Sequence, residues 1–198
     1  MFRELGKEVQ SVYEVISEKA LTGKMCKYII DYVETDEFTW LQGPLDAAPW
    51  DRIELNPDYM KANHLAGAMR SSNSEYDDLY EELIPVLESY NEAFGFHIAG
   101  VRDIQIHKFE VGHQRPAATD LFLKAPKTEH RKLVVYIDLN ADFEGGKVFI
   151  KRGAQVTPIE PSVGKGVVIP SYQLYGVEPV TKGTSYKLAI WGCGERFR

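Results

Sequence analysis

Histidine and cysteine are the residue types most able to hold a metal, and in this chain their spacing is poor for that chemistry. His113 is followed two positions later by Arg115, so it forms no His-x-carboxylate pair. His107 falls in an expected strand, where a lone histidine more often makes structural hydrogen bonds. Cys26 and Cys193 form no Cys-x-x-Cys pair, which favours two buried thiols in a reducing compartment. These residues alone indicate no metal site.

The composition is that of one folded domain. Of 198 residues, 44% are hydrophobic and 12% aromatic, enough for a packed core. The net charge of -6 argues against a nucleic-acid partner, because phosphate contacts need clustered Lys and Arg. No apolar run approaches the roughly 20 residues that cross a bilayer, and the N-terminus lacks the apolar stretch of a signal peptide. We therefore expect a cytoplasmic protein with no membrane partner, or a component of a particle assembled inside a cell.

The first half of the chain is predicted to be mainly helical. Residues 5–16 and 22–34 carry apolar side chains at three- and four-residue steps, and Thr22 is a suitable N-cap. Residues 74–94 form the clearest helix, with acidic residues in the first turn and Gly95 as the C-terminal cap. A strand is expected at 50–55.

After Gly95 the pattern changes to short strands separated by Gly- and Pro-containing turns, which is typical of a sandwich or barrel. The expected strands are 101–110, 133–139, 146–151, 156–159, 166–169 and 186–191. Helices followed by strands indicate an α+β fold. We expect a single domain over 1–198, with a helical support in 1–99 and a β core in 100–198.

Five segments of the β half resemble the prolyl-4-hydroxylase-like branch of the Fe(II)- and 2-oxoglutarate-dependent oxygenases. They are IQIHKFEVG at 104–112, Asp120, HRKLVVYIDLN at 130–140, FEGG at 143–146, and the stretch 166–191. The resemblance implies a double-stranded β-helix (jelly roll) in the C-terminal half, with the N-terminal helices as its support. It also implies that Arg131 and Asn140 are scaffold residues, and that Gly145 and Gly146 form a turn with positive φ.

The resemblance locates the positions where the chemistry would be, and the usual residues are missing there. In such oxygenases a His-x-Asp pair and a distal His hold the iron. The corresponding positions are Ala118, Asp120 and Tyr175, and the position of the basic residue that binds 2-oxoglutarate is Ser185. Asp120 alone cannot hold iron, so we expect a degenerate site with no metal and no cofactor.

Lys187 leaves an anion contact open. Ser185 and Lys187 point to the same face of a strand, so the long Lys187 side chain could reach the vacant position and hold a carboxylate or phosphate. The other interpretation is a solvated Lys187 on an outer face. Residues 113–117 lie at the expected mouth of the barrel, and we interpret them as an interaction loop.

The losses at Ala118, Tyr175 and Ser185 favour a non-catalytic structural, assembly or binding protein that contacts other proteins or copies of itself. Because oxygenases of this branch are frequent in tailed bacteriophages, a virion component is a further expectation, by analogy. The alternative is an active or atypical Fe(II)/2-oxoglutarate-dependent dioxygenase (hydroxylase), with His113 or His107 swung into the iron position. A third possibility is a metal-free anion sensor that uses Lys187.

Overall fold

The computed structural model describes residues 15–17, 19–35, 40–42, 51–55, 85, 88, 91, 95–121 and 130–195. The largest sheet among them is antiparallel, with the strand order β1-β10-β6-β13-β4-β3-β2. Its strands are β1 (Val15–Ser17), β2 (Leu41–Gln42), β3 (Asp51–Leu55), β4 (Ile98–Phe109), β6 (His130–Asp138), β10 (Gly166–Pro170) and β13 (Ser185–Gly194).

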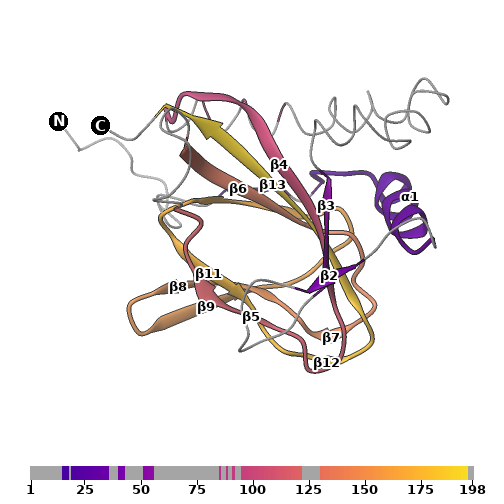
Figure 1. Ribbon diagram of the computed structural model, residues 1–198. Helices are drawn as coiled ribbons and strands as arrows, with labels where there is room; N and C mark the ends of the chain where they lie inside the picture. The colour runs from indigo at the N-terminus through magenta and orange to yellow at the C-terminus, as the bar shows by residue number, and fades with distance from the viewer. Residues whose placement is uncertain are drawn as a thin grey trace, which may run out of the picture.

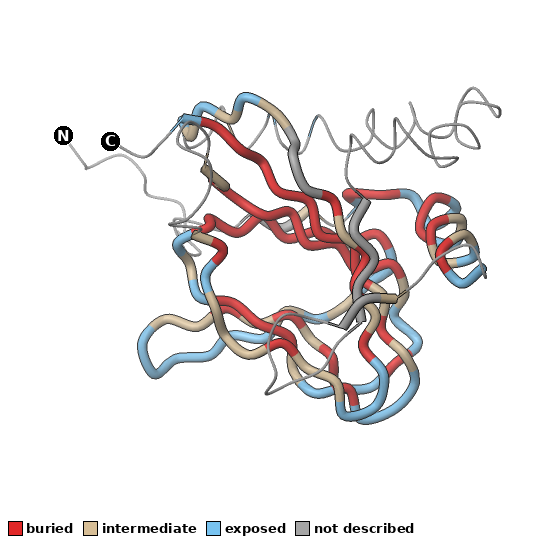
Figure 2. The backbone as a smooth tube through the Cα atoms, viewed as in Figure 1, coloured by how far each residue is buried: buried red, intermediate tan, exposed pale blue. Residues whose placement is uncertain are grey.

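A smaller antiparallel sheet faces the large one, with the strand order β5-β11-β8-β9 (Figure 1). Its strands are β5 (Arg115–Ala118), β8 (Val148–Arg152), β9 (Gln155–Ile159) and β11 (Leu174–Val177), and β7 (Glu144–Gly145) pairs with β12 (Val180–Lys182) beside them. Long buried stretches occur in both sheets (Figure 2). One apolar cluster joins them, including Tyr136 and Trp191 from the large sheet and Ile150 and Tyr175 from the small one. The predicted jelly roll is therefore confirmed.

Helix α1 (Gly23–Val33) covers the other face of the large sheet. Thr22 caps it, because its hydroxyl accepts from the Met25 amide at 3.3 Å. The buried residues Met25, Cys26, Ile29 and Val33 follow the three- and four-residue spacing and pack against the strands. The helix predicted at 22–34 is confirmed. No helix in the described ranges is long and apolar enough to cross a membrane.

The other helical predictions fare differently. Of residues 74–94, only 85, 88 and 91 are described, and all three are helical. Gly95 has φ +63° and donates its amide to the Asn91 carbonyl at 2.8 Å, as a C-terminal cap does. The helix predicted at 5–16 is wrong at its end, because Val15 and Ile16 lie in β1 and pair with β10. These β-branched residues suit an edge strand. Residues 5–14 lie outside the described part.

All six strands predicted after Gly95 are present, as is the one at 50–55, with shifted ends. The short strands β2, β5, β7, β11 and β12 were not predicted. They are two to four residues long, and Pro116 in β5 and Gly176 in β11 interrupt the alternation there. The missed strands matter because β5 and β11 carry residues of the candidate site.

Gly145 provides a test of the turn before β8. Its φ is +74°, and a Cβ there would lie 2.2 Å from the Pro179 carbonyl oxygen. We expect Gly145→Ala to lower the free energy of unfolding by about 2–4 kcal/mol, measured by urea unfolding. Gly153 is the matched control, with φ +59° and nothing within 4 Å of a Cβ. Gly153→Ala should cost only about 1–2 kcal/mol, and equal losses would contradict the steric argument.

Candidate functional site

The three predicted iron positions lie on β5, just after β5, and on the neighbouring strand β11. Ala118 on β5 and Tyr175 on β11 are directly opposite each other in the small sheet. Asp120 follows β5, and the Tyr175 hydroxyl donates to its Oδ2 at 2.6 Å. The structure therefore brings buried Asp120 and Tyr175 together, with half-buried Ala118 beside them.

The Asp120 carboxylate is fully engaged by side chains of this protein. The Trp191 indole Nε1 donates to the same Oδ2 at 2.9 Å. Arg115 Nη2 donates to Oδ1 at 3.1 Å, in an ion pair whose side chains are 8% and 7% exposed. Both carboxylate oxygens thus accept hydrogen bonds, and a guanidinium balances the negative charge.

Arg115 is the site residue that the sequence analysis missed. It is the first residue of β5, and its Nη1 also donates to the Tyr175 carbonyl at 2.8 Å. Its guanidinium carbon lies 4.0 Å from the centroid of the Tyr175 ring. The interpretation of 113–117 as an interaction loop is therefore wrong at Arg115, whose side chain turns inward. The signal available in the sequence was that a buried Asp120 without a metal needs another cation.

Tyr175 is a hydrogen-bond donor here. Burial raises the pKa of its phenol well above the ordinary 10.0, and the nearby Asp120 charge raises it further although Arg115 opposes this. Burial likewise raises the pKa of Tyr136, whose ring packs edge-on against Tyr175 with centroids 5.7 Å apart. Both phenols therefore stay protonated at neutral pH.

These two phenols predict alkaline sensitivity. Folded-state pKa values above the ordinary 10.0 mean that the unfolded chain loses these protons first as the pH rises. The stability contributed is fully present below about pH 10 and falls above it by about 1.4 kcal/mol per pH unit for each phenol. Tyrosinate absorbance should show both groups ionising only as the protein unfolds. With Tyr136→Phe the unfolding step should release one phenol fewer. Ionisation of both phenols in the folded protein would contradict this.

Lys187 and Ser185 share a face of β13, as predicted, and that face is the barrel interior. Lys187 is 0% exposed and pairs with Asp138, its register partner on β6. The interpretation of Lys187 as a solvated outer residue is wrong, because the ammonium lies inside, 5.0 Å from the Phe143 ring centroid. The Ser185 hydroxyl is buried without a hydrogen-bond partner in the described part of the chain.

The histidines considered as replacement ligands do not gather. His107 Nε2 lies 2.9 Å from Gln105 Oε1, which can only accept, so Nε2 carries the proton. Nδ1 then accepts from the Tyr136 hydroxyl at 2.6 Å. His113 and His130 each have one buried ring nitrogen with no hydrogen-bond partner among the described residues. Within the described ranges, no three His, Cys, Asp or Glu residues form a group that could hold a metal.

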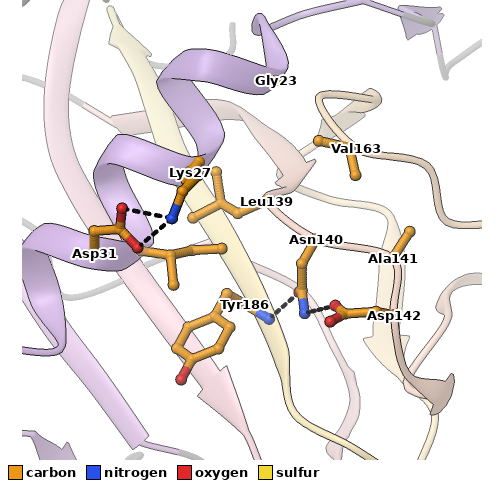
Figure 3. A pocket seen from close by; sticks show the side chains of 10 residues that line it. Gly23, Lys27, Asp31, Leu139, Asn140, Ala141, Asp142, Val163 and Tyr186 are labelled. Carbon is orange, nitrogen blue, oxygen red and sulfur yellow. Dashed lines mark hydrogen bonds and ion pairs between the residues drawn. The ribbon is translucent and has the colours of Figure 1, made fainter.

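A separate pocket of about 500 Å³ lies outside the barrel, between α1 and residues 139–142 (Figure 3). At its rim Lys27 and Asp31 pair with each other at 2.8 Å. Asn140 donates to the Thr184 carbonyl at 2.7 Å and accepts from the Tyr186 amide at 2.8 Å, which supports its role as a scaffold residue. None of the predicted site residues lines this pocket.

Iron and 2-oxoglutarate, which the resemblance implies, do not fit the residues present. Ala118 offers no donor atom, the Tyr175 phenol is protonated, and both Asp120 oxygens are engaged. The positive charge of Arg115 beside Asp120 would also repel a metal cation. For a dicarboxylate, Ser185 carries no charge and Asp138 neutralises Lys187.

The sequence matches no protein-family model and no curated protein. The structure is similar to a viral collagen prolyl hydroxylase from Paramecium Bursaria Chlorella virus-1, with 14% identity, a TM-score of 0.64, and 93% of this chain and 97% of that one covered. It is also similar to a Pseudomonas putida prolyl-4-hydroxylase, with 12% identity, a TM-score of 0.66 and 96% of each chain covered. A Trichoplax adhaerens prolyl hydroxylase gives 13% identity and a TM-score of 0.67 over 93% of this chain and 84% of that one. The chain therefore has the fold of the prolyl-4-hydroxylase-like 2-oxoglutarate-Fe(II) oxygenases.

Proposed function

We propose that this protein is a non-catalytic structural, assembly or binding protein built on the prolyl hydroxylase-like oxygenase fold. The observation that carries the proposal is that the protein's own side chains occupy both carboxylate oxygens of Asp120. Its oxygens accept from Arg115, Tyr175 and Trp191 at 2.6–3.1 Å, so the last carboxylate of the expected iron site serves the protein's own packing.

A second observation supports the proposal at the other end of the interior. Lys187 lies two residues after Ser185, the expected 2-oxoglutarate position, on the same face of β13, and it is paired with Asp138 and shielded from solvent. A buried ion pair is stable only when its partners satisfy each other. An entering dicarboxylate would have to displace Asp138, which itself stays buried.

The test separates this proposal from an active Fe(II)/2-oxoglutarate-dependent dioxygenase. The full chain is incubated with Fe(II), ascorbate and 2-oxoglutarate, and succinate is measured, with a known prolyl hydroxylase as positive control. We expect no succinate above the protein-free blank. The proposal would be overturned if the wild type produced succinate and the Asp120→Asn variant did not, because Asp120 would then serve an iron site.

The proposal also covers the binding partners of the protein and its location. Other proteins or further copies of this chain are the proposed partners, in the cytoplasm or, for a phage protein, in the virion. Light scattering after size exclusion should give a mass of more than one chain, or mass spectrometry of purified particles should detect the chain. A monomer absent from particles, with no co-purifying protein, would contradict this part.

A further inference from the structure

We propose that Arg115 is the resident ligand of a guanidinium-binding site formed by Asp120, Tyr175 and Trp191, and that the site binds a free guanidinium ion when the Arg115 side chain is removed. The inference rests on the proposed function in one respect, which is that no metal competes for Asp120. The ligand class of this interior site is a planar organic cation, and in the wild type the chain's own Arg115 side chain provides it.

The contacts of Arg115 match what a guanidinium requires. One nitrogen donates to a carboxylate oxygen of Asp120 at 3.1 Å and another to the Tyr175 carbonyl at 2.8 Å. The Arg115 guanidinium carbon lies 4.0 Å from the Tyr175 ring centroid, a distance at which an aromatic face attracts a cation. An anion, a carbonyl and an aromatic face are arranged here for a planar cation with forked donors.

The walls of this site are held by contacts that do not involve Arg115. The Tyr175 hydroxyl and the Trp191 indole both donate to Asp120 Oδ2, and so fix the carboxylate. Tyr136 packs edge-on against Tyr175, and the Arg131 guanidinium lies 4.2 Å from the Trp191 ring centroid. Truncating Arg115 therefore removes the occupant and leaves the receptor in place.

The test is chemical rescue of Arg115→Ala. We expect the variant to melt about 10 °C below the wild type, because Asp120 is left buried without its counter-ion. For a Kd near 10 mM, about 50 mM guanidinium should raise its Tm by about 3 °C over equal NaCl. Urea, which has the same shape without the charge, should give no rise. Wild type and Lys182→Ala, whose pair with Glu144 is 75% and 63% exposed, should show no rise. Equal Tm values in guanidinium and NaCl would overturn the inference.

Arg115→Lys keeps the test decisive if Arg115→Ala folds under neither condition. Lysine keeps the charge but lacks the planar fork, so we expect a Tm at least about 5 °C below wild type. A wild-type Tm would overturn the inference, because any cation would then suffice. The two proposals fail separately: succinate production by the wild type would defeat the proposed function, while absent rescue defeats only the guanidinium site.

Discussion

Asp120→Ala lowers the free energy of unfolding by about 3–5 kcal/mol, the usual cost of removing one partner from a buried ion pair. The Arg115 guanidinium, 8% exposed, loses its counter-ion. The Tyr175 hydroxyl and the Trp191 indole lose their shared acceptor, and each buried unsatisfied donor adds to the cost. Urea unfolding followed by tryptophan fluorescence measures the loss.

Two control variants separate charge from hydrogen bonding at Asp120. Asp120→Asn keeps an acceptor for Tyr175 and Trp191 but removes the charge, so its loss should be smaller than that of Asp120→Ala. Glu144→Ala breaks an exposed pair with Lys182, 63% and 75% exposed, and should cost about 0–1 kcal/mol. A loss below about 1 kcal/mol for Asp120→Ala would mean that the carboxylate does not hold the interior together.

Lys187→Met should also cost about 3–5 kcal/mol, because it leaves the Asp138 carboxylate buried and unpaired. Lys187 is 0% exposed, and it lies between His107 on β4 and Asp138 on β6 in one row across the large sheet. Thermal and urea unfolding of the single variant give the loss.

The double variant Lys187→Met with Asp138→Leu tests whether the pair acts as a unit. When both charges are replaced by apolar groups of similar volume, stability should return to within about 1–2 kcal/mol of wild type. Additive losses in the double variant would show that the two side chains contribute independently. If Lys187→Met left the free energy of unfolding unchanged, the Lys187 ammonium would have to reach solvent in the wild type.

The strands β6 and β10 could be predicted from their dense apolar runs, whose burial needs no knowledge of partners. Strand β13 shows the limit of that reasoning. Period-two alternation places Ser185 and Lys187 on one face, but Leu188 and Ala189 are both buried on opposite faces of this central strand. Alternation therefore could not tell the inner face from the outer one.

The site was harder to predict than the fold, because it depends on an irregular pairing. The register between β5 and β11 shifts between Tyr175 and Val177, and this irregular strand carries Arg115 inward. The resemblance predicted the positions of Ala118 and Tyr175, which are directly opposite each other. It could not predict the inward turn of Arg115, which depends on that shifted pairing and on the charge of Asp120.

We propose that Arg115, and not a metal, balances the charge of Asp120. A crystal structure of the full chain grown with millimolar Mn²⁺ and 2-oxoglutarate, with anomalous data, tests it most directly. We predict density for the Arg115 guanidinium against Asp120 and no anomalous peak beside Ala118, Asp120 and Tyr175. An anomalous peak within about 2.5 Å of an Asp120 oxygen, with Arg115 displaced, would contradict the account.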